Sequence, residues 1–219
     1  MTRETLNRSL AEEGTLSVSF RLLIDGVPTY YQMKVTLSDG SYLVAMSNVD
    51  TERRRDRALA LAQEQINRDA LTGVKSKHAF VEAEKRWNAL MQQQKAEPFA
   101  VVWCDLNGLK AVNDTRGHQA GDEYIREACR AICNVFKHSP VYRVGGDEFV
   151  AVLTGADYEN RASLIERLEA ANDEHIRSGG VIIACGMAEL RRESDSCFGT
   201  VVERADAAMY EDKKRLKLP

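Results

Sequence analysis

Three acidic residues stand at the ends of two segments whose apolar character predicts buried strands. Asp105 closes the run FAVVWCD, and Asp147 and Glu148 follow Gly145-Gly146 at the mouth of a two-residue hairpin, VYRV-GG-DEFVAVL. In a ferredoxin-like sheet these strands are neighbours, so we expect the carboxylates to meet at one edge. Burying like charges together is costly unless a cation neutralises them. An oxygen-only donor set favours Mg²⁺ with substrate phosphates completing its shell, and Mn²⁺ is the alternative metal.

The segment that follows Asp105 carries groups suited to a nucleotide. Its sequence, LNGLKAVNDTRGHQAGD, predicts a glycine-punctuated loop in which Asn107-Gly108 offers backbone N–H groups to phosphate oxygens. Asn113 and Asp122 supply an amide and a carboxylate for a purine edge, and a carboxylate suits the N1 and N2 donors of guanine. Near the C-terminus, Lys213 to Lys217 place cations where they could meet a triphosphate. Taken alone, GGDE is more typical of a surface hairpin, and the lysines are typical of a solvated helix end.

The elements that must position these groups begin at residue 69. Apolar residues at helical spacing alternate with buried-strand runs in the order α-β-α-β-β-α-β-α, which contains the split βαβ arrangement of ferredoxin-like sheets. The fold class is therefore predicted to be α+β. The predicted helices include a segment that starts at a Ser N-cap, residues 119–136 and 201–214, and the predicted strands include FAVVWCD and GVIIACGMAEL.

The N-terminal third has a different character. Residues 15–49 hold three β-rich segments separated by Asp-Gly turns at 25–26 and 39–40, which predicts an antiparallel meander. This meander resembles the last three strands of a PAS sensory domain. Residues 50–68 predict a linker helix with an apolar seam at Leu59, Ala62 and Ile66. The seam fits two alternatives equally, a pair of helices in a dimer or a solvated connector. The predicted boundaries are 1–50, 51–68 and 69–219.

The composition of the chain limits the classes of protein to which it can belong. The 219 residues carry a net charge of −3, which argues against nucleic acid as the main partner. No apolar run is long enough to span a bilayer, and the polar N-terminus lacks a secretory signal. We therefore expect a cytoplasmic chain, or the cytoplasmic part of a longer sensor, without membrane contact. The five cysteines are expected to be reduced core residues; Cys129 and Cys133 are four apart on one helix, without further ligands for zinc.

Four motifs together carry a resemblance to a known family. RVGGDEF at 143–149, DLNGLKAVNDTRGHQAGD at 105–122, DALTG at 69–73 and ADAAMYEDKK at 205–214 closely resemble the GGDEF family of diguanylate cyclases. The resemblance covers roughly residues 69–217. It implies an adenylate-cyclase-like or palm-like fold, with a central antiparallel-mixed sheet flanked by helices. It also implies Mg²⁺-dependent condensation of two GTP molecules into cyclic di-GMP and pyrophosphate by a dimer of GGDEF domains.

The resemblance assigns roles residue by residue. Asp105, the backbone carbonyl of Leu106 and Asp147 would hold the metal, and Glu148 would support the metals or deprotonate the attacking 3′-hydroxyl. Asn113 and Asp122 would bind guanine. The remaining substrate-binding positions would hold the phosphates or lie against the nucleotide, and these are Gly108, Leu109, Lys110, Gly145, Gly146, Lys213 and Lys217.

Two departures and two alternatives accompany this interpretation. Lys217 stands where the family often has arginine, which predicts weaker phosphate binding because lysine cannot make a bidentate fork. Residues 136–139 (FKHS) replace an R-x-x-D site, which predicts no feedback inhibition there. One alternative is a non-catalytic module that binds GTP or cyclic di-GMP. The other keeps the fold and either makes another cyclic dinucleotide or hydrolyses GTP.

Overall fold

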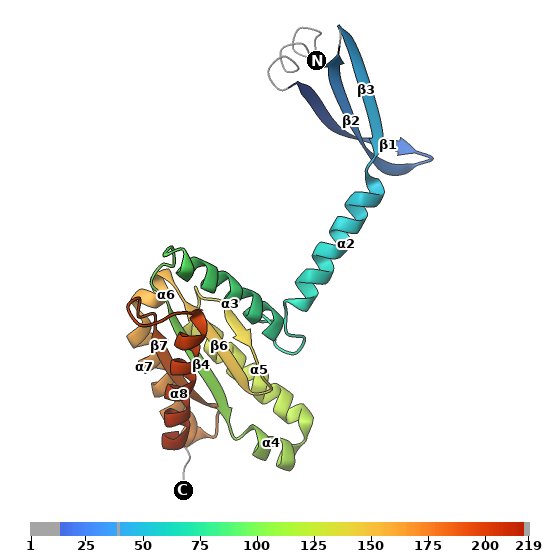
Figure 1. The fold of residues 1–219 in the computed structure, drawn as a ribbon. Helices are drawn as coiled ribbons and strands as arrows, with labels where there is room; N and C mark the ends of the chain where they lie inside the picture. The colour runs from blue at the N-terminus through green and yellow to red at the C-terminus, as the bar shows by residue number, and fades with distance from the viewer. Residues whose placement is uncertain (1–13, 39, 217–219) are drawn as a thin grey trace. The chain divides into compact units, whose positions relative to one another are not determined.

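The chain divides into two compact units, residues Met1–Gln63 and Glu64–Pro219. The computed structural model describes residues 14–38 and 40–216, and Figure 1 follows their strands and helices along the chain. No helix in these ranges is long and apolar enough to cross a bilayer.

The first unit contains an antiparallel sheet of three strands in the order β1-β2-β3. Asp25 and Gly26 form the two-residue turn between β1 and β2, and both have positive φ, 51° and 78°, as the hairpin turn requires. The predicted meander is therefore confirmed, although Asp39 of the second turn lies outside the described residues. The strands are β1 (Thr15–Ile24), β2 (Val27–Ser38) and β3 (Ser41–Asn48).

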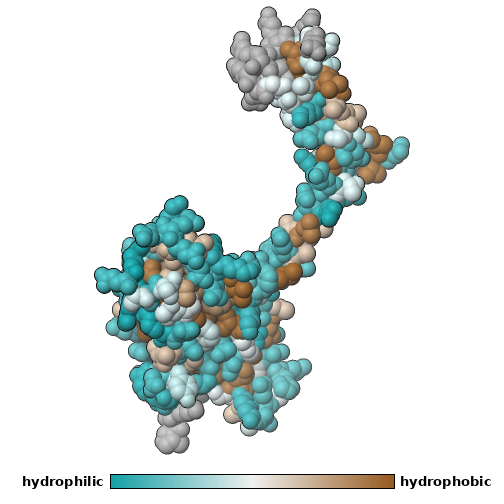
Figure 2. Space-filling model, viewed as in Figure 1, coloured by the Kyte–Doolittle hydropathy of each residue, from teal (hydrophilic) through white to brown (hydrophobic). Residues whose placement is uncertain are grey.

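Helix α2 (Asp50–Ile66) follows the sheet and has no buried residue. Its first turn is capped by Asn48, whose Oδ1 accepts a hydrogen bond from the Asp50 amide at 2.9 Å. Leu59 and Ile66 of the predicted seam are 53% and 55% exposed. Apolar side chains also remain on the surface of the first unit, as Figure 2 shows in brown. The pairing of two such helices in a dimer stays a prediction.

The second unit is built on an antiparallel sheet of four strands in the order β5-β6-β4-β7. With the strands taken in chain order, this is the ferredoxin-like arrangement that the sequence predicts. Strand β4 lies inside the sheet and is buried on both faces, which explains its continuous apolar run. The strands are β4 (Ala100–Asn107), β5 (Val141–Arg143), β6 (Glu148–Leu153) and β7 (Ile182–Glu189).

Four long helices cover the two faces of this sheet (Figure 1). Helices α5 (His118–Val135) and α7 (Arg161–Ser178) contribute Ile125, Ile132 and Leu168 to one core. Helices α3 (Lys77–Gln92) and α8 (Phe198–Leu216) contribute Trp87 and Phe198 to the other. Ser76 caps α3 as expected, because its side chain accepts a hydrogen bond from the Ala79 amide.

The structure corrects the sequence prediction in two places. Residues 109–116, predicted to be loop, form helix α4 (Leu109–Arg116), which lies between Gly108 and Gly117, both at positive φ. Strand β5 ends at Arg143 and β6 begins at Glu148, so the hairpin turn has four residues rather than two. A further short helix, α6 (Gly155–Glu159), follows β6.

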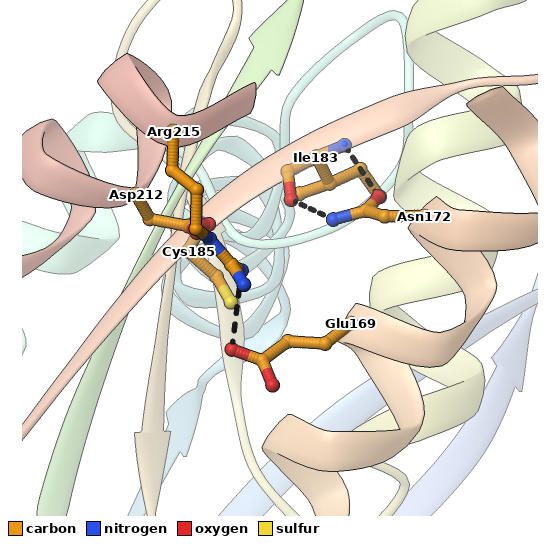
Figure 3. Close-up of polar contacts among 6 residues, drawn as sticks. All are labelled: Glu169, Asn172, Ile183, Cys185, Asp212 and Arg215. Carbon is orange, nitrogen blue, oxygen red and sulfur yellow. Dashed lines mark hydrogen bonds and ion pairs between the residues drawn. The ribbon is translucent and has the colours of Figure 1, made fainter. Parts of the chain in front are cut away.

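Side chains from two helices cover the outer edge of β7 (Figure 3). Buried Asn172 of α7 donates to the Ile183 carbonyl at 2.7 Å and accepts from the Ile183 amide at 2.9 Å. Asp212 of α8 accepts from the Cys185 amide at 2.9 Å and pairs with Arg215 at 2.7 Å. These contacts satisfy backbone groups that an open edge would otherwise present to another strand.

Candidate functional site

The three acids of the predicted metal site converge at one end of the central strands. Asp105 on β4 lies directly opposite Glu148 on β6 in the strand register. The next residue, Leu106, donates its amide to the Asp147 carbonyl at 3.0 Å, which brings the hairpin turn against the end of β4. Asp105 is 5% exposed, so its carboxylate lies at a buried position. The geometry therefore brings Asp105, Leu106, Asp147 and Glu148 together as the sequence predicts.

The glycines of the turn make room for this arrangement. The amides of Val144 and Gly145 both donate to the Glu148 carbonyl, at 3.0 and 3.4 Å. A Cβ atom on Gly145 would lie 2.3 Å from Glu148 Oε2, so any larger residue would push the acid aside. Gly146 has no atom within 4 Å of such a position and is exposed. Gly145 therefore shapes the acidic site, whereas Gly146 leaves open space beside it.

The electrostatics of the site are those of crowded acids with one nearby cation. Burial raises the pKa of Asp105; Lys213 opposes the rise through a 2.5 Å hydrogen bond, and Asp147 and Asp206 add to it. Burial also raises the pKa of Glu148, and Asp105, Asp147 and Asp206 reinforce the rise. Such crowding stores unfavourable energy that a cation would relieve.

The donor set fits Mg²⁺ held by few protein ligands. Among the described residues, no group of three or more His, Cys, Asp or Glu side chains is arranged to hold a metal ion by itself. Two carboxylates, Asp105 and Asp147, with the Leu106 carbonyl instead match the usual mode of Mg²⁺, which takes one or two carboxylates and fills its shell with water and phosphate oxygens. Such a donor set leaves coordination positions for water and phosphate oxygens.

Three of the predicted phosphate-binding positions lie at the start of helix α4. Gly108, at φ 84°, connects β4 to helix α4. Leu109 and Lys110 follow it in the first turn of the helix. The first amides of a helix lack internal partners and attract anions. Lys213, another predicted phosphate-binding residue, forms an ion pair with Asp105 on β4. Lys217 lies outside the described residues.

The two predicted guanine-binding residues come from adjacent helices. A Cβ atom on Gly121 of α5 would lie 1.9 Å from Asn113 Oδ1 of α4, so the amide rests directly on the glycine. Asp122, the next residue, is exposed. The absence of a side chain at position 121 therefore lets the Asn113 amide of α4 pack against α5, next in sequence to Asp122.

Two contacts of the site were missed by sequence reasoning. Arg143 donates to both carboxylate oxygens of Asp69, at 3.1 and 3.3 Å, and to the Gly146 carbonyl at 2.7 Å. Asp69 also accepts from the Thr72 hydroxyl at 2.6 Å. Asp69 and Arg143 open the motifs DALTG and RVGGDEF, so their joint presence was the available signal. The second is the electrostatic interaction of Asp206, two turns from Lys213 on the same face of α8, which adds to the rise that burial causes in the pKa of Asp105 and Glu148.

The raised pKa of Glu148 predicts a pH-dependent effect on stability. Folding favours the protonated acid, so the ionised acid destabilises the fold at pH values above its folded pKa, and the effect vanishes below its ordinary value of 4.5. In buffer with a chelator, Glu148→Gln is expected to unfold at higher urea than the wild type at pH 7.5, with the gain shrinking towards pH 4.5. Exposed Glu203→Gln should show no such trend; a gain that grows as the pH falls would contradict this electrostatic account.

Comparison with known proteins agrees with this geometry. The family described as "Diguanylate cyclase, GGDEF domain" matches residues 66–217. Probable diguanylate cyclase DgcE of Escherichia coli K12 is 32% identical over 181 residues, which cover 80% of this chain and 16% of DgcE. Diguanylate cyclase A of Treponema denticola is 28% identical over 159 residues, 69% of this chain and 43% of the relative. The chain thus spans less than half the length of these curated relatives.

Solved structures show the same fold. The GGDEF domain of DgcB from Caulobacter crescentus, in complex with c-di-GMP, has 28% identity and a TM-score of 0.57, with 68% of this chain and 91% of that chain covered. Diguanylate cyclase SiaD of Pseudomonas aeruginosa, in complex with its activator SiaC, has 28% identity and a TM-score of 0.58, with 75% and 64% covered. The chain therefore belongs to the GGDEF-domain family of diguanylate cyclases.

Proposed function

We propose that the chain condenses two GTP molecules into cyclic di-GMP with release of pyrophosphate. The observation that carries the proposal is the placement of Asp105 opposite Glu148, with Asp147 adjacent and Lys213 on the buried carboxylate. In each of two symmetric steps a 3′-oxygen forms a bond to an α-phosphorus, and the bond from that phosphorus to the β-phosphate oxygen breaks. A bound Mg²⁺ would neutralise phosphate charge and acidify the attacking hydroxyl.

The chain's own residues divide the remaining work. Asp105, Asp147 and the Leu106 carbonyl would hold the metal, which would orient the triphosphate. Glu148, whose pKa burial raises, would accept the proton of the 3′-hydroxyl. The first amides of α4, with Lys110, Lys213 and Lys217, bind the β- and γ-phosphates.

Asn113 and Asp122 are proposed to select guanine. Inosine lacks the 2-amino group of guanine, so the wild type should bind 3′-deoxy-GTP, which cannot be cyclised, about tenfold more tightly than 3′-deoxy-ITP. Asp122→Ala should bring the two affinities close together, whereas Asp114→Ala, an exposed acid on α4, should keep the preference. Calorimetric titration measures both. An Asp122→Ala variant with undiminished preference would exclude this role.

Catalysis requires two sites facing each other, since each site holds one GTP. We therefore propose that the active species is a homodimer and that α2 sets how often the two sites meet, under the control of the PAS-like segment before it. Specific activity should rise with protein concentration until dimers dominate. Removing residues 1–55 should change both activity and dimerisation, and a truncated chain unchanged in both would contradict this part.

Two further properties belong to the proposal. The reaction is placed in the cytoplasm, where GTP is made, and the five free cysteines agree with a reducing compartment. Cyclic di-GMP is not expected to inhibit through residues 136–139. There, the His138 amide donates to buried Asp157 at 2.9 Å, and the arginine and aspartate of an R-x-x-D site are missing.

A further inference from the structure

Two cysteine thiols share a cavity away from the acidic site. The cavity has a volume of about 320 Å³ and lies between helix α5 and the turn that follows α2. Its lining comprises Thr72, Gly73, Val74, Arg126, Cys129, Arg130 and Cys133. The proposed cyclase reaction uses none of the residues of this lining.

The two thiols differ in access and in acidity. Cys129 is 5% exposed, whereas Cys133, one helical turn later, is half-buried. A hydrogen bond from the Cys129 thiol lowers the pKa of Cys133 to about 7, and the same bond raises the pKa of Cys129. At neutral pH the accessible thiol is therefore also the one with substantial thiolate character, which is the reactive form.

Positive charge lines the same cavity. Arg126 and Arg130 both pair with Glu123, each at 3.2 Å, so two guanidinium groups share one carboxylate and one positive charge is left over. Their side chains are 41% and 61% exposed, which leaves them accessible to a ligand. A cavity of this charge favours an anionic reagent over a cationic one.

A chain of hydrogen bonds joins Thr72, in the wall of this cavity, to the hairpin of the acidic site. Thr72 lines the cavity beside Cys129. Thr72 donates to Asp69 at 2.6 Å, Asp69 accepts from Arg143 at 3.1 Å, and Arg143 donates to the Gly146 carbonyl at 2.7 Å. A group forced into the cavity would press on the 72–74 turn and so on the first link of this chain.

We propose that Cys133 is a modification site for small disulfides that carry carboxylates, and that its modification loosens the hairpin at residues 144–147. The Cys133 thiolate attacks one sulfur of the disulfide, a new S–S bond forms, and the S–S bond of the reagent breaks. The second half of the reagent leaves as a thiolate, so the disulfide is the only oxidant needed. The effect on catalysis rests on the proposed cyclase activity, whereas the modification itself does not.

The first experiment measures the modification. The full chain is reacted with dithiodipropionate, a dianion, or with cystamine, a dication, and the labelled cysteines are located by peptide mass mapping. Cys133 should be labelled, Cys133→Ser and Cys133→Ala should lose that label, and Cys197→Ser should keep it. Arg126→Gln combined with Arg130→Gln should slow dithiodipropionate at Cys133 about fivefold more than it slows cystamine. The proposal would be overturned if the double arginine substitution slowed both reagents equally at Cys133, or if Cys133 were not labelled.

The second experiment measures transmission to the hairpin. Amide hydrogen exchange of residues 69–75 and 143–149 should accelerate on labelling of the wild type and stay unchanged in Cys133→Ser treated in the same way. Label at Cys197, which is half-buried at the start of α8, serves as the matched control and should have no such effect. Label at Cys133 without faster exchange would refute the transmission. Faster amide exchange on labelling of a chain that makes no cyclic di-GMP would support the transmission to the hairpin and refute the proposed function.

Discussion

Replacing Asp105 with asparagine is expected to lower the rate of cyclic di-GMP formation by about a thousandfold. Asp105 is the most buried of the three acids and lies between Glu148 and Lys213. The amide keeps the size of the carboxylate and removes its charge, so the fold should persist while metal affinity falls. Initial rates of product formation with GTP and Mg²⁺ measure the effect.

The control for this substitution is Asp114→Asn on helix α4. It makes the same chemical change at an exposed residue near the same site, and activity should stay within about twofold of the wild type. Raising the Mg²⁺ concentration should partly restore Asp105→Asn and leave Asp114→Asn unaffected. An Asp105→Asn variant that keeps more than a tenth of the activity would mean that this carboxylate does not hold the metal.

The second large effect concerns stability, at the contact between β7 and α8. A Cβ atom on Gly186 would lie 2.0 Å from the Met209 amide nitrogen and 2.4 Å from the Ala205 carbonyl oxygen. These are backbone atoms of a helix, which cannot move aside as a side chain can. Gly186→Ala is therefore expected to lower the free energy of unfolding by about 2–3 kcal/mol. Because α8 carries Lys213, activity should fall as well.

Gly199→Ala at the start of α8 is the matched control. The nearest atoms to a Cβ there lie 3.6 and 3.7 Å away, at ordinary contact distance. Alanine also favours the helix, so stability should stay the same or rise slightly. Urea unfolding followed by tryptophan fluorescence reports on the second unit, since both tryptophans, Trp87 and Trp103, lie within it. Equal stability of the two variants would contradict the close approach of α8 to β7.

Much of the second unit could be predicted from sequence because its signals are local. The run FAVVWCD predicts a strand buried on both faces, and β4 is such a strand. Asp105 and Glu148 stand at the ends of two strands that a ferredoxin-like order makes neighbours, and they are register partners. Here the pattern of burial, the order of elements and the cost of crowded acids all point to the same arrangement.

The features that sequence reasoning missed depend on contacts distant in sequence or on mixed local signals. The segment 107–122 predicts a loop because glycines and polar residues are frequent in it, yet Gly108 and Gly117 lie just outside the two ends of α4, where positive φ is needed. The Asp69–Arg143 pair joins residues 74 apart. Asp206 matters through its repulsion of Asp105 and Glu148, which only the packing of α8 brings about.

The first unit shows the limit of a short resemblance. Its meander follows from the Asp-Gly turn and from strand propensity, both of which are local. The PAS-like interpretation depends on what the sheet belongs to, and three strands are shared by many folds. It stays a prediction, as do the boundaries drawn at residues 50 and 68.

Chromatography and mass analysis of the products formed from GTP and Mg²⁺, with wild type and Asp147→Ala side by side, test the central claim most directly. The wild type should release cyclic di-GMP and pyrophosphate, and the variant, which should remain folded, should release neither. If the wild type binds GTP but makes no cyclic dinucleotide, even at concentrations where it is dimeric, the chain is a binding module. Another cyclic dinucleotide, or GDP and phosphate, would mean that the fold is right and the assigned reaction wrong.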